Sequence, residues 1–495
     1  MNCKILRGAP GDGKTLTMLG AMLTNSGRYL LASPRIDLLE EQISHLHANR
    51  PPDKFVGINA IHSKQRQRAR VERRLEDALC AQADASYAIV GVTHETLLKI
   101  DPGLLKGWHV GIDEIPDGAI KSGKFKATTT WSSLERYYSL VPVVGGNWWE
   151  VRPREGVDQP SLGALANDGH SLLPFHAAAR DPRRPLLVDI GAWEDASLPG
   201  RGVGWFSVWT MADLAACASV TIAAASFQHS LVYHAHRSLP GDRITFEEVR
   251  VRTAPRAKPR VRLHYFCEHR GSTEWWKTNE GEHCLVEMSK YLESIGFSGY
   301  WSCNETIRLA FQHRYKELWR EPRQSGTNSL REHTSCAIIY SNKAQAADEP
   351  ILDVLGLDRQ AVLEAREYED LWQFVMRGAI RDPAYAGSYD VYVYSRDQAE
   401  VLKAKLVENS ITDDVTVIPV VEAGLLDVVR PGATIPESRR ASDTRSLEER
   451  REETRARNNE RQRQSRAAKR EQKERSGTLR GRGRPRKQPM PSPAA

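Results

Sequence analysis

The chain of 495 residues has few cysteines and no long apolar run. No apolar stretch approaches the roughly 20 residues that a membrane-spanning helix needs, and no secretory signal heads the sequence. The seven cysteines are scattered without a C-x-x-C pair, so the sequence indicates neither a zinc knuckle nor a disulfide framework. We therefore expect no membrane association and a location inside the cell, in the cytoplasm if the source is a bacterium or a phage.

Charge is distributed unevenly along the chain. The formal net charge is +7, but residues 439–487 alone carry 19 Lys and Arg against 8 Asp and Glu, a net of +11. The remaining residues are therefore mildly acidic, with a net charge of −4. At 495 residues the chain is long enough for two or three domains. The charge asymmetry predicts that a basic tail, which attracts a polyanion, follows this globular part.

A glycine-bracketed loop follows the apolar run of residues 3–6 and precedes a helical stretch. Its sequence, G-x-x-x-x-G-K-[ST], is the phosphate-binding pattern in its strand-loop-helix context. The eight residues are Gly8, Ala9, Pro10, Gly11, Asp12, Gly13, Lys14 and Thr15. We predict that the loop binds ATP, with Lys14 at the β- and γ-phosphates and Thr15 on Mg²⁺. Asp12 is unexpected, because a carboxylate beside phosphates repels them unless it points to solvent.

A second acidic motif, Trp-His-Val-Gly-Ile-Asp-Glu-Ile-Pro, occupies residues 108–116. An apolar strand that ends in two acids is often only a solvated strand end. Downstream of a phosphate-binding loop, however, Asp113 would order Mg²⁺ through its water shell, and Glu114 would polarise the attacking water. We therefore predict Asp113 as a metal residue and Glu114 as a catalytic residue.

Apolar strand-like runs alternate with amphipathic helices along most of the chain, which indicates an α/β fold with parallel sheets. The first set of runs covers residues 29–32, 87–92, 110–112 and 220–225. The second set covers residues 263–266, 300–303, 337–340, 389–394 and 415–420. Between the sets, residues 240–259 are rich in Pro, Arg and charge, which is typical of a connector.

The order of these motifs resembles that of the superfamily 2 helicases, the DExD/H-type nucleic-acid translocases, with Asp-Glu-Ile-Pro in the box position. Further short motifs match in order, and the resemblance implies that they bind nucleic acid. They are Ser33, Pro34 and Arg35 (with Ala32, motif Ia), Thr93 and His94 (motif Ib), and Gly326, Thr327 and Asn328 (motif V). Ala224-Ala225-Ser226 resembles the Ser-Ala-Thr element that links hydrolysis to strand movement.

The stretch Gln373 to Arg381 resembles motif VI, whose arginines touch the γ-phosphate across the domain cleft. Gln373, Arg377 and Arg381 recur at i, i+4 and i+8, so on a helix they share one face. We predict all three as catalytic residues, with Arg377 preferred as the arginine finger. The spacing alone is equally consistent with a solvated cationic face, and the second arginine stands eight rather than seven residues after the glutamine.

The resemblance implies two RecA-like P-loop domains, residues 1–235 and 262–430, joined by a linker at 236–261. About 110 residues separate Asp113 from Ser226, which predicts an inserted subdomain at about residues 120–212. Half of the chain's twelve tryptophans fall there: Trp131, Trp148, Trp149, Trp193, Trp205 and Trp209. Such rings can stack on unpaired bases, but we expect them to fill the core of a small β-rich subdomain.

The tail at residues 436–495 is predicted to be disordered or helical and to bind DNA. Arg482-Gly-Arg484-Pro resembles an AT-hook, which lays arginines in the narrow minor groove of A·T-rich duplex. Residues 455–466 are similar to a bZIP basic region, but no leucine heptad follows. An unspecific polycation or a localisation signal remains an alternative.

Together these features predict an ATP- and Mg²⁺-dependent helicase or translocase that moves along single-stranded DNA and holds duplex through its tail. The abbreviated N-terminus resembles that of phage or prophage helicases. Two alternatives stay open: the ATPase of a phage DNA-packaging terminase, and a DNA-binding regulator whose ATPase acts as a switch.

Overall fold

The computed structural model describes residues 1–428, with gaps at 53–55, 66–68, 127–130, 144–146, 160–171, 182–183, 198–201, 239–243, 252–254, 313–317 and 323–328. By its contacts the chain divides into Met1–Ala433 and Thr434–Ala495. The basic tail, with Arg482 and Arg484, and the motif at Gly326, Thr327 and Asn328 lie outside the described residues. None of the helices in the described part of the chain has the length and apolar character that a bilayer span requires.

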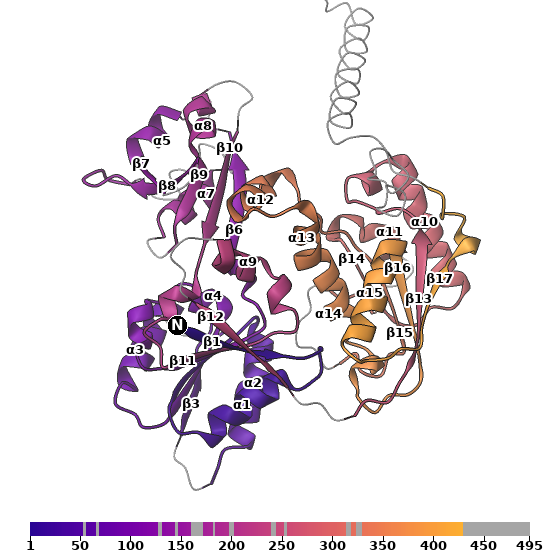
Figure 1. Ribbon diagram of the computed structural model, residues 1–495, viewed down its shortest axis with the longest axis horizontal. Coiled ribbons are helices and arrows are strands. Elements are labelled where there is room, and N and C mark those ends of the chain that lie inside the picture. The colour runs from indigo at the N-terminus through magenta and orange to yellow at the C-terminus, as the bar shows by residue number, and fades with distance from the viewer. Residues whose placement is uncertain are drawn as a thin grey trace, which may run out of the picture. The chain divides into compact units, whose positions relative to one another are not determined.

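The first sheet has seven parallel strands in the order β12-β1-β11-β5-β2-β4-β3 (Figure 1). Its central strands are nearly continuous apolar runs, as expected for a sheet that is buried on both faces. The strands are β1 (Asn2–Arg7), β2 (Arg28–Ser33), β3 (Gly57–Ala60), β4 (Ala88–Thr93), β5 (His109–Asp113), β11 (Ser219–Ala223) and β12 (Thr245–Arg250).

Helices cover both faces of this sheet. On one face, the apolar sides of α1 (Lys14–Thr24) and α2 (Ile36–Ala48) pack on the strands. On the other face lie α3 (Val71–Ala81), α4 (His94–Leu97) and α9 (Leu231–Ser238). The phosphate-binding pattern therefore stands between the first strand of a parallel sheet and the helix that follows it.

The predicted insertion is an antiparallel sheet of order β6-β10-β9-β8-β7. Its strands are β6 (Ile120–Phe125), β7 (Tyr138–Pro142), β8 (Trp148–Pro153), β9 (Leu186–Asp189) and β10 (Val203–Val208), and its helices are α5 (Trp131–Tyr137), α7 (Leu173–Ala179) and α8 (Ile190–Glu194). Trp193 and Trp205 are buried in its core, and Trp209 is buried at its base against the first sheet. Trp148 and Trp149 are half-buried on β8, and the side chain of Trp131 is outside the described set.

The second parallel sheet has the order β14-β15-β16-β13-β17. Its strands are β13 (Arg260–Cys267), β14 (Tyr300–Cys303), β15 (Ser335–Ile339), β16 (Ser388–Ser395) and β17 (Val415–Pro419). Its helices are α10 (Asn279–Ser294), α11 (Leu309–Gln312), α12 (Glu349–Leu355), α13 (Arg359–Leu363), α14 (Glu369–Val375) and α15 (Arg396–Glu408). The predicted α/β class, with two parallel sheets and an inserted subdomain, is thus confirmed.

The linker predicted at residues 236–261 is shorter than expected. Within it, β12 pairs in parallel with β1 from Asn2 to Arg7, and Asn2 donates to Glu247 at 2.9 Å. Without β12, the edge of β1 would expose unpaired backbone groups, so the sheet recruits part of the connector. Residues 255–259 remain as the described part of the connector that enters β13.

Candidate nucleotide site

The loop Gly8–Thr15, which has the sequence pattern of a phosphate-binding loop and is called by that name below, joins β1 to α1 through two glycines in left-handed conformations, Gly11 at φ 94° and Gly13 at φ 82°. Residues with a Cβ adopt these angles at a cost, which explains the glycines. Lys14 points back into the loop, where its Nζ donates to the carbonyl oxygens of Gly8 and Ala9, both at 2.9 Å. Burial lowers the pKa of Lys14, although the nearby carboxylates act in the opposite direction.

Asp113, at the end of β5, is buried and held by two side chains. Its Oδ1 accepts from the Thr15 hydroxyl at 2.6 Å, and its Oδ2 accepts from Gln42 Nε2 at 2.6 Å. Burial raises the pKa of Asp113, and these two hydrogen bonds oppose that rise. Sequence reasoning missed Gln42, because an amide on a helix carries no signal until the helix is placed beside β5.

Glu114 follows Asp113 with φ at 64°, a left-handed conformation for a residue with a side chain. Its backbone N–H donates to the carbonyl oxygen of Ala223 at the end of β11, at 3.0 Å. Such strain persists where the surrounding structure imposes it, and it often marks functional positions. Burial raises the pKa of Glu114 to about 7, which is a suitable value for a general base at neutral pH.

The prediction of one helix through Gln373, Arg377 and Arg381 is wrong. Helix α14 ends at Val375, Gly378 is extended, and Arg381 ends a separate 3₁₀ helix at Ala379–Arg381. The chain passes so close to β16 that a Cβ on Gly378 would lie 2.2 Å from the Tyr389 hydroxyl. The three side chains nevertheless line the same cavity.

This cavity, of about 400 Å³, lies between the phosphate-binding loop and the second sheet's domain. The first domain contributes the loop, the acids Asp113 and Glu114 at the end of β5, and one face of α2 to the walls of this cavity. The domain of the second sheet contributes the predicted arginines. The residues that line it include Pro10, Gly11, Gly13, Lys14, Thr15, Gln42, Asp113, Glu114, Gln373, Arg377 and Arg381. Arg381 also packs against the loop, since a Cβ on Gly11 would lie 2.7 Å from its Cγ.

Arg377 is the buried arginine of this set, with 3% of its surface exposed. Its Nη2 donates to Gln373 Oε1 at 3.2 Å, whereas its buried Nε has no hydrogen-bond partner among the described residues. Burial lowers the pKa of Arg377 to about 10, with Arg381 adding to the effect. The guanidinium therefore stays charged at neutral pH and retains donor capacity for an anion.

A hydrogen-bonded path joins this arginine to the first domain. Gln373 Nε2 donates to Glu369 Oε1 at 2.9 Å, and Glu369 is also hydrogen-bonded to Ser226, which follows β11. Burial acts to raise the pKa of Glu369, but Lys405 and the hydrogen bonds from Ser226 and Gln373 outweigh it, so the pKa is lowered. The carboxylate is thus ionised, and it links the two domains.

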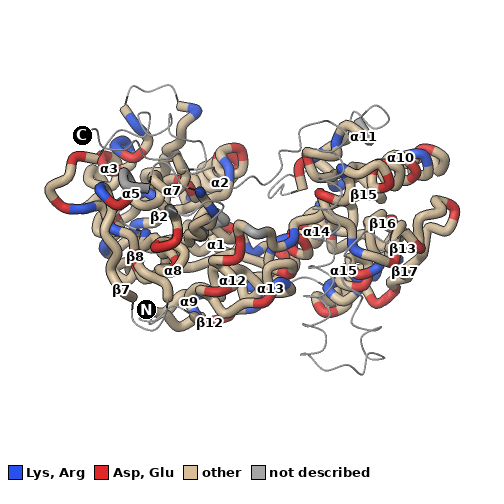
Figure 2. Tube along the Cα trace, turned by 90° about the horizontal axis from the view of Figure 1, so that it is seen from above, with Lys and Arg blue, Asp and Glu red and all other residues tan. Residues whose placement is uncertain are grey.

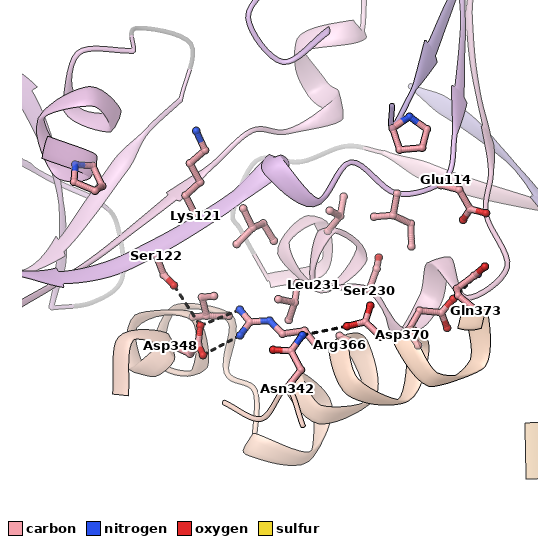
Figure 3. Close-up of a pocket in the computed structure, with 18 of the residues that line it drawn as sticks. Glu114, Lys121, Ser122, Ser230, Leu231, Asn342, Asp348, Arg366, Asp370 and Gln373 are labelled. Atoms are coloured by element: carbon pink, nitrogen blue, oxygen red, sulfur yellow. Dashed lines mark hydrogen bonds and ion pairs between the residues drawn. The ribbon is translucent and has the colours of Figure 1, made fainter. Parts of the chain in front are cut away.

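A second cavity, of about 580 Å³, adjoins the first and shares Glu114 and Gln373 with it (Figure 3). Figure 3 shows the Arg366 guanidinium facing Asp348, with the two bonds at 2.9 Å each, and Glu114 beside Gln373 at the opposite end. Acidic side chains outnumber basic ones around it, which disfavours a path for phosphates.

Residues predicted to bind nucleic acid divide into two groups. Ser33 is fully buried and donates to Gln42, and His94 is buried with its Nε2 2.9 Å from the Asp113 carbonyl oxygen, so neither side chain is open to a strand. Burial lowers the pKa of His94 to about 4. Pro34, Arg35 and Thr93, in contrast, line a cavity of about 480 Å³.

The described residues contain no cluster of three or more His, Cys, Asp or Glu that could hold a metal ion by itself. The pair formed by Thr15 and Asp113 nevertheless fits Mg²⁺, which prefers oxygen ligands and is usually bound through one or two protein groups, several waters and substrate phosphates.

No family model matches the sequence, and no curated protein matches it. Among solved structures, an XPD helicase is similar, at 10% identity and a TM-score of 0.49, over 84% of this chain and 96% of that one. S. cerevisiae Dbp5 bound to RNA and ADP BeF3 is similar at 12% identity and a TM-score of 0.30, over 84% and 85%. Mycobacterium smegmatis helicase Lhr bound to ssDNA and AMP-PNP is similar at 11% identity and a TM-score of 0.29, over 83% and 46%.

Proposed function

We propose that this chain is an ATP-dependent nucleic-acid helicase or translocase. One observation carries the proposal: a single cavity is lined by the phosphate-binding loop with Lys14, by the acid pair at Asp113 and Glu114, and by Arg377, which follows α14 in the domain of the second sheet. A cation and a carboxylate from one domain with a cation from another are the groups that phosphoryl transfer to water requires.

Each residue has a definite role in that reaction. Lys14 moves its ammonium from the loop carbonyls to the β- and γ-phosphates, and the loop amides bind phosphate oxygens. Thr15 and Asp113 would hold Mg²⁺, which would neutralise phosphate charge when bound. Glu114 orients the attacking water and accepts its proton, and Arg377 with Arg381 stabilises the charge on the transferred phosphoryl group.

The path from Ser226 through Glu369 and Gln373 to Arg377 couples hydrolysis to domain movement. It places the first sheet, helix α14 and the arginine in one series of hydrogen bonds. When the phosphoryl group that Arg377 contacts leaves, the guanidinium loses a partner, and the series rearranges. Such a change moves the domains relative to each other, which a translocase needs.

Nucleic acid is proposed to bind along the ends of β2 and β4. Arg35 and Thr93 share a cavity there with Lys64 and Lys99, and the buried Nε of Arg35 has no hydrogen-bond partner among the described residues. Both lysines are ion-paired with acids of the same cavity, Lys64 with Asp37 and Lys99 with Glu72 and Glu95, so Arg35 is the cation that carries this part of the proposal. Lys and Arg are interspersed with Asp and Glu along the described chain (Figure 2). The basic tail supplies a second, electrostatic attachment, and we propose DNA as the polymer.

An ATPase assay tests the proposal. We expect turnover that single-stranded DNA stimulates, and loss of turnover in Lys14→Ala, because the ammonium at the phosphates is removed. Turnover that is indifferent to DNA and RNA would indicate a switch-type ATPase in a regulator. Stimulation by RNA alone would support the translocase but show that it acts on RNA and not on DNA.

A further inference from the structure

The connector between the two parallel sheets brings Arg256 to the phosphate-binding loop. Its Nη2 donates to Asp12 Oδ1 at 2.9 Å, and the two side chains are only 7% and 10% exposed. Its Nη1 donates to the carbonyl oxygen of Ile380 at 3.4 Å, one residue before Arg381. A single guanidinium therefore contacts the loop and the segment that carries the arginines.

The second oxygen of Asp12 is used within the loop. Oδ2 accepts from the backbone N–H of Ala9 at 2.7 Å, and the side chain lies across Gly8, where an added Cβ would be 3.0 Å from that oxygen. Gly11 and Gly13, on either side of Asp12, line the nucleotide cavity, but Asp12 does not. The carboxylate thus points toward Arg256 and does not line that cavity.

This orientation explains why the loop can contain Asp12, a carboxylate that is unexpected beside phosphates. A negative charge a few ångströms from a triphosphate opposes binding, and burial reduces the screening that water and salt would otherwise provide. Arg256 supplies the compensating charge from outside the loop. It is a residue of the connector, for which sequence reasoning predicted no role.

We propose that Arg256 is a positioning residue that neutralises Asp12 and fixes the phosphate-binding loop to the connector, so that the affinity for a nucleoside triphosphate depends on this pair. The inference rests on the proposed function, because it takes the ligand of the cavity to be ATP. Arg256 does not touch the reacting atoms; it acts through Asp12.

The test is a double-mutant cycle on the full chain, with binding of ATP, ADP and AMP measured by titration. Arg256→Gln should weaken ATP binding about tenfold, because the uncompensated negative charge of Asp12 would then repel the nearby triphosphate. The loss should shrink from ATP to ADP to AMP as the ligand loses charge. Asp12→Asn should strengthen ATP binding, and Asp12→Asn with Arg256→Gln should return affinity to within about threefold of the parent, because both charges are gone.

Two controls separate this role from a structural one. Arg256→Lys keeps the charge and should restore most of the affinity, whereas Arg260→Gln, which removes the exposed ion pair with Asp414 at the start of β13, should not change it. Thermal unfolding of each variant shows that the fold is retained. If Arg256→Gln binds like the parent, or if the double variant binds as weakly as Arg256→Gln, the pair does not act by charge and the inference is overturned. A parent chain that binds no ATP would instead overturn the proposed function itself.

Discussion

Glu114 is the residue whose protonation should control turnover. Its pKa is raised to about 7, chiefly by burial. A general base works in its ionised form, so kcat/KM should fall about tenfold for each pH unit below 7 and level off above it. Steady-state ATPase rates between pH 5.5 and 9 measure this profile. A rate that stays flat down to pH 5.5 would show that Glu114 does not take the proton.

Replacing the same carboxyl tests its role without changing pH. Glu114→Gln should retain ATP binding but slow hydrolysis by about 10² or more, because the amide cannot accept the water's proton. Equilibrium binding and single-turnover hydrolysis separate the two effects. Turnover within a few-fold of the parent would remove Glu114 from the catalytic set.

Arg377 and Arg381 make different contacts, and this predicts an order of effects. Arg377 is buried with an unused donor, whereas Arg381 packs beside Gly11 of the loop. Arg377→Ala should reduce kcat by about 10³ with much less change in ATP affinity, since a finger acts on transition-state charge. Arg381→Ala should do less to kcat. The reverse order would assign the finger to Arg381, and two silent variants would leave this segment without a catalytic role.

At the scale of elements, the break after α14 places these arginines, and Gly378 makes the break possible. A Cβ there would meet the Tyr389 hydroxyl at 2.2 Å and the His333 carbonyl oxygen at 2.8 Å. Gly378→Ala should therefore shift the segment and cost about 1–3 kcal/mol of unfolding free energy, as overpacking does. It should also lower kcat, because Arg377 follows the shift. Urea unfolding and ATPase rates on one preparation test both effects, and an unchanged kcat in a destabilised variant would separate the break from catalysis.

This break also shows what sequence can and cannot predict. The strand-loop-helix arrangement around Gly8–Thr15 and the strand that ends at Asp113 were predictable, because each depends on a pattern of consecutive residues. The i, i+4 spacing of Gln373 and Arg377 predicted that both side chains face the same site. The prediction that the helix continues beyond Val375 was wrong, because the chain packs closely against Tyr389 at Gly378. Helical or strand periodicity carries no information on such long-range contacts.

The same limit applies to residues that act across the chain. Gln42 on Asp113 and Arg256 on Asp12 are separated from their partners by 71 and 244 positions. His94 and Ser33 were predicted to face nucleic acid from their resemblance to helicase motifs Ib and Ia, but both are buried and hydrogen-bonded within the first domain. These contacts depend on how α2, α4 and the connector pack on the first sheet, which the local sequence does not determine.

At the scale of the whole molecule, the basic tail is the part whose role is independent of the ATP cavity. Truncation after Pro436 removes the net charge of +11 carried by residues 439–487 and none of the proposed ATPase residues. Basal turnover should therefore survive, while DNA affinity falls. The salt dependence should flatten too, since each phosphate contact contributes roughly 0.9 to the slope of log K against log salt.

A matched point variant distinguishes groove binding from simple attraction. Arg484→Ala should lose preference for A·T-rich over mixed duplex more than it loses total affinity, because an arginine in a narrow minor groove reads its enhanced negative potential. Loss of affinity without loss of preference would make the tail an unspecific polycation. Binding titrations of the full chain, the truncated chain and this variant at several salt concentrations measure both quantities. A slope that truncation leaves unchanged would show that the tail does not touch DNA and serves another partner.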